Sequence, residues 1–145
     1  MNQALAPAVA ASLRHWHRMV AARDLAELPA LLHPDVVFHS PVAFKPHHGP
    51  AAVALILTTV LRVFRDFAYE REFATDGGSS VALEFSASVG EKQLKGIDLI
   101  RFDASGRIVD FEVMVRPLSG LQALGDEMGR RLAHAQRGPA GETPG

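Results

Sequence analysis

The stretch from Leu94 to Leu118 reads LKGIDLIRFDASGRIVDFEVMVRPL and decides the fold of this chain. Apolar runs over residues 97–102 and 108–115 flank the sequence Asp-Ala-Ser-Gly, which is typical of a turn. Runs of this length that carry β-branched and aromatic residues on both sides of a turn predict a β-hairpin. We therefore expect two antiparallel strands here.

The alternation of side chains along this hairpin singles out Asp98. Because successive side chains of a strand point to opposite faces, Asp98 shares a face with Ile100, while Phe111 and Val113 share an all-apolar face of the second strand. If that apolar face lines the interior, Asp98 lies there too. A buried carboxylate is costly unless it is protonated, paired or hydrogen-bonded. Asp98 is therefore the first candidate catalytic residue, and a register shift or a structural hydrogen bond is the alternative explanation.

The composition bounds the kind of protein. The chain has 145 residues, 48% of them hydrophobic, a formal net charge of -1 and no cysteine. These values fit one domain, which we expect over residues 1–137, and neither a disordered chain nor a nucleic-acid binder. The sequence GPAGETPG over residues 138–145 predicts a disordered tail. The absence of cysteine excludes disulfides, and the longest apolar run, residues 51–61, is too short to cross a bilayer, so we expect a cytoplasmic protein with no membrane partner.

Apolar periodicity predicts the other elements. Helices are expected over residues 8–22, over a short segment after a capping box at Asp24, from Pro50 to about residue 67, and after Ser119; further strands are expected over residues 36–40, 69–74 and 81–89. This order predicts an α+β fold: a cone-shaped, curved antiparallel sheet with three helices of the N-terminal half packed on its concave face, plus a C-terminal helix.

Helices that lean over a strongly bent sheet enclose a cone, and such a cone usually contains a pocket. We expect an apolar pocket for a small hydrophobic molecule, with these ligand-binding residues: Trp16, Val20, Phe38, Ile56, Val60, Phe85, Ile100, Phe111 and Val113. His47 and His48 could reach over its mouth, although adjacent loop histidines are commonly solvated. No histidine pair has the spacing of a metal site, so we expect no metal and no cofactor.

Three segments carry a resemblance to a known family: RDLAELPALLHPDVVFHSPV over residues 23–42, VALEFSASV over residues 81–89, and GIDLIRFDASGRIVDFEV over residues 96–113. Together with the order of the predicted elements, they resemble the NTF2-like superfamily, in its SnoaL-like and ketosteroid-isomerase-like branch. The resemblance spans about Leu13 to Val115. It implies a cone-shaped α+β barrel that is commonly a homodimer through its sheet and holds a small apolar ligand.

The resemblance also implies roles for single residues. In the isomerases, an aspartate before a proline at the end of the first strand is the general base, and that position here is Ser40. The oxyanion hole pairs a tyrosine, whose position falls at or beside Trp16, with a neutral aspartic acid, whose position falls on Asp98. A serine hydroxyl without an activating partner is too weak a base for a carbon-bound proton, and the nearby His39 should point to the other face of its strand. We therefore take Asp98 and Ser40 as catalytic candidates and do not expect ketosteroid isomerisation by the standard mechanism.

Three functions remain open from the sequence. The first is a cofactor-independent enzyme, such as an isomerase, cyclase or epoxide hydrolase, that uses Asp98 as acid or base. The resemblance implies that an epoxide hydrolase needs an inward Asp-Arg-Asp set. Val113 occupies the approximate position of the second carboxylate, and Arg116 could supply the positive charge only if a bulge turned it inward. The second is a non-catalytic protein that binds a small hydrophobic ligand, and the third is a dimeric interaction module whose cone is filled by its own side chains. An open cavity of roughly 300 Å³ or more that exposes Asp98 favours the first two, and a packed cone favours the third.

Overall fold

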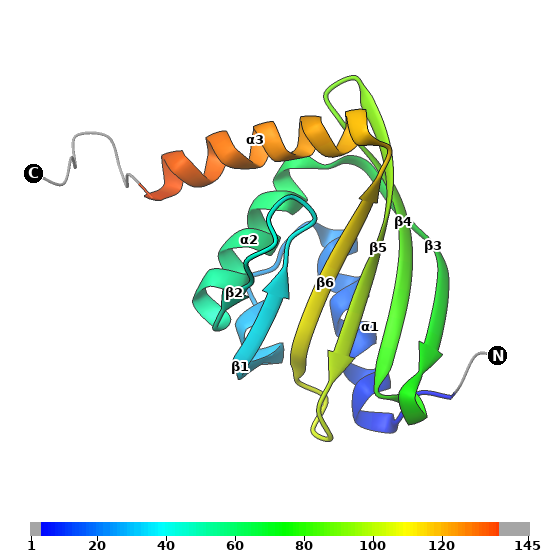
Figure 1. The fold of residues 1–145 in the computed structure, drawn as a ribbon. Helices are drawn as coiled ribbons and strands as arrows, with labels where there is room; N and C mark the ends of the chain where they lie inside the picture. Colours follow the sequence, from blue (N-terminus) through cyan, green and yellow to red (C-terminus); the bar gives the residue numbers. More distant parts are fainter. Residues whose placement is uncertain (1–3, 137–145) are drawn as a thin grey trace, which may run out of the picture.

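The computed structural model describes residues 4–136, so the tail expected over residues 138–145 lies outside the described part of the chain (Figure 1). The elements in chain order are α1 Pro7–Ala22, the 3-10 turn η1 Leu28–Leu31, β1 Leu32–His39, β2 His47–His48, α2 Pro50–Val63, β3 Arg65–Thr75, the 3-10 turn η2 Asp76–Gly78, β4 Ser80–Val89, β5 Lys92–Phe102, β6 Ile108–Arg116 and α3 Leu118–Gln136. None of the described helices is long and apolar enough to span a membrane.

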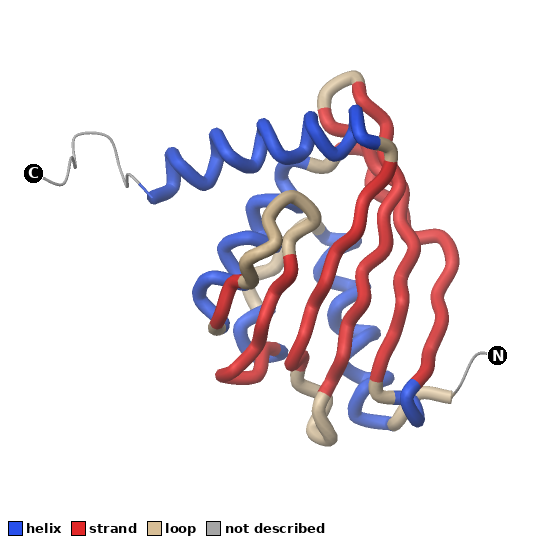
Figure 2. The backbone as a smooth tube through the Cα atoms, viewed as in Figure 1, coloured by secondary structure: helices blue, strands red, loops and turns tan. Residues whose placement is uncertain are grey.

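The strands form one curved sheet in the order β2-β1-β6-β5-β4-β3 (Figure 2). The predicted α+β class is confirmed, with one correction: the sheet is mixed, because β1 pairs in parallel with β6. β2, α2, β3, β4 and β5 lie between these two strands along the chain. The sequence carries no local signal for the direction in which such distant strands pair.

Helices α1 and α2 cover one face of the sheet, and α3, which begins two residues after the end of β6, runs across the end of the sheet (Figure 1). The expected apolar stripe of α1 is buried, and the Trp16 ring meets the Phe111 ring edge-on at 5.5 Å between centroids. The predicted second helix is reduced to the 3-10 turn η1. Its proposed cap, Asp24, accepts a hydrogen bond from the backbone N–H of Ala26 at 3.0 Å, which makes a local turn in place of a helix start.

The β5–β6 hairpin has the alternation that its sequence predicts. Asp98 pairs with Val113 and Ile100 pairs with Phe111, so all four side chains lie on the face that the helices cover. The turn is fixed by Asp103, whose Oδ1 accepts from the backbone N–H groups of Ser105 and Arg107, both at 2.9 Å. The hydroxyl of Ser12 on α1 donates to the carbonyl of Gly106 at 2.5 Å, which ties the turn to the helix layer.

Candidate functional site

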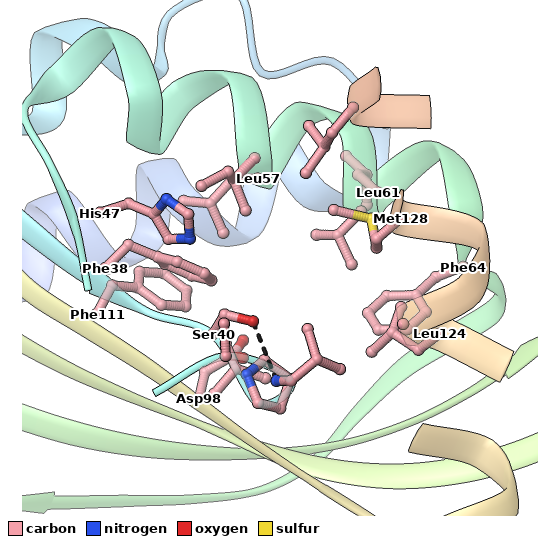
Figure 3. Close-up of a pocket in the computed structure, with 18 of the residues that line it drawn as sticks. Phe38, Ser40, His47, Leu57, Leu61, Phe64, Asp98, Phe111, Leu124 and Met128 are labelled. Carbon is pink, nitrogen blue, oxygen red and sulfur yellow. Dashed lines mark hydrogen bonds between the residues drawn. The ribbon is translucent and has the colours of Figure 1, made fainter. Parts of the chain in front are cut away.

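A cavity of about 260 Å³ lies between the sheet and the three α-helices (Figure 3). Its wall is almost entirely apolar. The sheet supplies Phe38, Phe111 and Val113, α1 and α2 supply Trp16, Val20, Ile56, Leu57, Val60 and Leu61, and α3 supplies Leu124, Met128 and Leu132. Few polar side chains reach this wall: those of Ser40, His47, Tyr69 and Asp98, with the indole N–H of Trp16.

Asp98 is the buried acid of the cavity, with 5% of its surface exposed. The phenol of Tyr69 donates a hydrogen bond of 2.6 Å to its Oδ2, and the indole N–H of Trp16 donates to the Tyr69 oxygen at 3.0 Å. Among residues 4–136, no other hydrogen bond to this carboxyl group is found, which leaves Oδ1 for a ligand in the cavity.

Burial decides the protonation state of Asp98. Loss of solvent raises the pKa of Asp98 to about 7, and the hydrogen bond from Tyr69, a smaller effect, lowers it. Burial, followed by the neighbouring Asp98 charge, raises the pKa of Tyr69 well above 10, so this phenol stays protonated and remains a donor. Near neutral pH a large share of the molecules therefore carries a neutral carboxylic acid in an apolar cavity.

Tyr69 is a site residue that sequence reasoning missed. It lies in the strand expected over residues 69–74, but the ladder between β3 and β4 shifts register on both sides of it, between Arg65 and Ala68 and between Tyr69 and Glu72. Such irregularities break the simple alternation from which a side chain's face is inferred. The remaining signal was composition, because Tyr69 is the single tyrosine of the chain.

Seven of the nine expected ligand-binding residues line the cavity: Trp16, Val20, Phe38, Ile56, Val60, Phe111 and Val113. Phe85 and Ile100 do not, and this corrects the expectation for them. Phe85 lies opposite Gly96 in the β4–β5 ladder, where its ring fills the space that a side chain at Gly96 would need. It belongs to the core together with Ile100, which follows Asp98 on β5 toward the hairpin turn, and each is 1% exposed.

Of the other candidate residues, two line the cavity and three do not. Ser40 lines the cavity, and its Oγ accepts the backbone N–H of Val42 at 3.1 Å. His39 points to the other face, as expected, and its Nε2 lies 3.1 Å from Oδ1 of Asp110. Arg116 is exposed and does not line the cavity. His47 does line it, and the adjacent His48 does not.

The part that α3 plays in the cavity was also missed. Glycines weaken a helix relative to alanine, and α3 contains Gly120, Gly125 and Gly129. The structure shows that Gly125 and Gly129 lie on the cavity wall between Leu124, Met128 and Leu132. Among the described residues, no atom outside its own stretch of the helix lies within 4 Å of the place that a Cβ at Gly129 would occupy, and Gly129 is exposed, so this glycine lies at the open edge of the cavity.

No group of three or more histidine, cysteine, aspartate and glutamate side chains in residues 4–136 is arranged to hold a metal ion. The cavity wall offers instead a hydrogen-bonding acid at the end of an apolar space. In this arrangement, the apolar wall can contact the carbon skeleton of a hydrophobic molecule, and Asp98 can form a hydrogen bond to one oxygen atom of that molecule. In ketosteroid isomerase, a carboxylic acid kept neutral in this way donates a hydrogen bond to the substrate oxygen.

Together, the curved sheet, the covering helices and the apolar cavity with a buried acid define a pocket protein of the NTF2-like class. The family model of the SnoaL-like domain matches residues 13–111. The chain belongs to this family, as its sequence led us to expect. No curated protein matches the chain at a significant level.

Solved structures support the same assignment. A steroid delta-isomerase from Pseudomonas aeruginosa is 63% identical, with a TM-score of 0.90 over 93% of this chain and 98% of that one. An uncharacterised protein with a cystatin-like fold from Silicibacter pomeroyi is 37% identical, with a TM-score of 0.80 over 87% and 88% of the two chains. An NTF2-like protein of unknown function from Mesorhizobium loti shares the fold, at 21% identity and a TM-score of 0.68 over 79% and 99%.

Proposed function

We propose that this protein is a cofactor-independent isomerase that shifts a carbon–carbon double bond in a small hydrophobic ketone. One observation carries the proposal: Asp98 is a buried acid whose pKa is raised to about 7 by burial, on the wall of an apolar cavity. The 63% identity to a steroid delta-isomerase over nearly the whole chain supports the same reaction class.

The chemistry explains why such an acid is useful. To move a double bond into conjugation with a carbonyl group, a proton leaves the carbon beside that carbonyl, and negative charge develops on the oxygen. Asp98 in its neutral form donates a hydrogen bond to this oxygen through the carboxyl group's free side, while Tyr69 holds Oδ2. In an apolar site the bond is stronger than in water, because water does not compete for it. Ser40 offers its hydroxyl hydrogen as a second contact for the ligand.

The expected substrate is compact and mostly apolar. The cavity of about 260 Å³ lies just below the usual range for ligand sites, which begins at about 300 Å³, and its open mouth admits a ligand that extends beyond it. A ketone with a ring or branched hydrocarbon skeleton fits this wall, whereas a charged substrate would lose its hydration without finding a partner.

Conversion of β,γ-unsaturated ketones tests the proposal. A panel that includes a Δ5-3-ketosteroid and smaller cyclic ketones is incubated with the protein, and ultraviolet absorbance follows the conjugated product. We expect turnover by the wild type, and a loss of about 100-fold or more in kcat for Asp98→Asn. Asp110→Asn is the matched control, because Asp110 lies on the neighbouring strand and pairs with His39 on the other face. No conversion of any member by the wild type would refute the isomerase.

Binding is measured separately through Trp16. The chain has a single tryptophan, and it lies on the cavity wall, so its fluorescence reports ligand entry directly. The conjugated ketone is expected to quench or shift this emission. Quenching without any turnover would identify a ligand-binding protein, and neither signal would favour a module that uses only its outer surface.

We further propose that the protein is a homodimer through the outer face of its sheet and that it is located in the cytoplasm. The outer face exposes nearly half of Phe73 and of Met114 among ion pairs such as Arg71 with Glu84. Exposed apolar side chains rimmed by charges are typical of a contact surface. Light scattering is expected to give the mass of a dimer for the wild type and of a monomer for Met114→Glu; a monomeric wild type would refute the dimer. Fractionation of cells tests the location.

A further inference from the structure

An isomerase of this kind needs a group that takes the proton from carbon, and Ser40 stands where the family resemblance would place that group. The hydroxyl of Ser40 lies beside the backbone N–H of Val42, and none of the described residues is a base in contact with it. The acceptor must therefore be another group on the cavity wall, and among the described residues three side chains on that wall carry an acidic or basic group: Asp98, Tyr69 and His47.

Two of these three are already committed to other bonds. The phenol of Tyr69 donates to Asp98 and receives the indole N–H of Trp16, so it has neither a free proton nor a basic oxygen to offer. Asp98 serves the substrate oxygen in the proposed function. His47 is the remaining group, and an imidazole is a usable base near neutral pH.

The sheet register explains why His47, and not His48, faces the cavity. In the antiparallel β1–β2 pair, His47 lies opposite Phe38, and His48 lies opposite Val37. Directly opposed residues point to the same face of a sheet, and Phe38 is a cavity residue. The ring of His47 lies 6.4 Å from the Phe38 ring between centroids and is turned toward the cavity (Figure 3).

The ring of His47 also differs from the rings of three histidines that are held by carboxylates. His15, His17 and His39 each lie within 3.1 Å of a carboxylate oxygen on the protein surface. No residue in the described range 4–136 forms a hydrogen bond with the imidazole of His47. A ring nitrogen is therefore available to a molecule in the cavity.

We infer that His47 is the proton acceptor and donor of the reaction, an inference that rests on the proposed isomerase function. Its unprotonated ring nitrogen takes the proton from the carbon between the carbonyl group and the double bond. The electrons of that C–H bond form a new C=C bond, and the carbonyl electrons move onto the oxygen held by Asp98. The imidazolium then gives the same proton to the far carbon of the original double bond, and the C=O bond forms again.

Substitutions at the two adjacent histidines test this inference. We expect His47→Gln to lower kcat for the ketone substrate by about 100-fold or more, because a general base contributes about this much. Binding of the conjugated ketone, followed by Trp16 fluorescence, should stay within about threefold of the wild type. His48→Gln is the matched control and should keep wild-type kcat, because its side chain lies outside the cavity.

Chemical rescue separates proton transfer from a role in shape. Free imidazole added to His47→Ala should restore part of the lost activity, and it should not restore Asp98→Asn. Wild-type kcat in His47→Gln would overturn the inference and leave the isomerase intact. Lost activity together with weakened ketone binding and no rescue would also overturn it, since His47 would then only shape the cavity. A wild type without turnover refutes the proposed function, and the inference with it.

Discussion

Tyr69 and Asp98 are joined by a hydrogen bond of 2.6 Å between the phenol oxygen and Oδ2, although they lie on β3 and β5 with the whole of β4 between them in the sheet. The bond crosses the concave face and is extended by Trp16 from α1. Three elements that are distant in the chain thus fix one side of the carboxyl group and leave the other side for a ligand.

Replacing Tyr69 tests how much this bond restrains the acid. In Tyr69→Phe, the hydrogen bond that lowers the pKa of Asp98 is lost, so that pKa should rise further above its present value of about 7. The indole N–H of Trp16 also loses its acceptor, and we expect a loss of about 1–3 kcal/mol in the free energy of unfolding. Urea denaturation at pH 6 measures this loss; unchanged stability would mean that the bond is unimportant to the fold.

The stability of the protein should depend on pH through Asp98. The pKa of Asp98 is about 7 in the folded chain and near the ordinary aspartate value of 3.8 in the unfolded one, so between these values the folded state binds the extra proton. The free energy of unfolding therefore falls as pH rises from about 4 to 7, by about 4 kcal/mol from this group, since one pH unit corresponds to about 1.4 kcal/mol.

Asp98→Asn should remove this dependence, because the amide stays neutral and can still accept from Tyr69. Above pH 7 the variant is expected to be more stable than the wild type in urea denaturation. Asp110→Asn, on the outer face, should keep the fall in stability between about pH 4 and 7 that Asp98 causes. If Asp98→Asn unfolds at every pH, the carboxyl group is structural and the site needs another explanation.

Gly129 should limit the size of the ligand. Because no described atom outside its own stretch of the helix lies within 4 Å of an added Cβ, Gly129→Leu can be accommodated, and its side chain would narrow the open edge of the cavity. We expect the bulkiest ketones of the panel to bind at least about tenfold more weakly in fluorescence titration, a loss of about 1.4 kcal/mol. Gly129→Ala is the control and should stabilise the helix by up to about 1 kcal/mol with little change in binding. Equal affinity in Gly129→Leu would place the ligand elsewhere.

Local pattern was enough to predict much of the fold. The hairpin over residues 94–118 and the apolar stripe of α1 follow from alternation and from helical periodicity, and they bring Asp98, Phe111 and Trp16 to the concave face. The parallel pairing of β1 with β6 depends on strands that are far apart in the chain, so no local signal predicted it.

The composition of the site was harder to predict because it depends on tertiary register. Irregular pairing in β3 turns Tyr69 inward, the missing side chain at Gly96 lets Phe85 sink into the core, and the two-residue strand β2 selects His47 over His48. Each of these outcomes is set by a partner strand and not by the residue's own neighbours in sequence.

The protonation state of Asp98 tests the central claim most directly. Near neutral pH, this carboxyl group is expected to be protonated in a large share of the molecules, on the wall of an apolar cavity. The ¹³C chemical shift of the Asp98 carboxyl carbon, followed across pH 3 to 9 in the intact protein with Asp98→Asn as the assignment control, should show a midpoint near the value of about 7 that burial produces. A midpoint near 4, typical of a solvated aspartate, would contradict the claim.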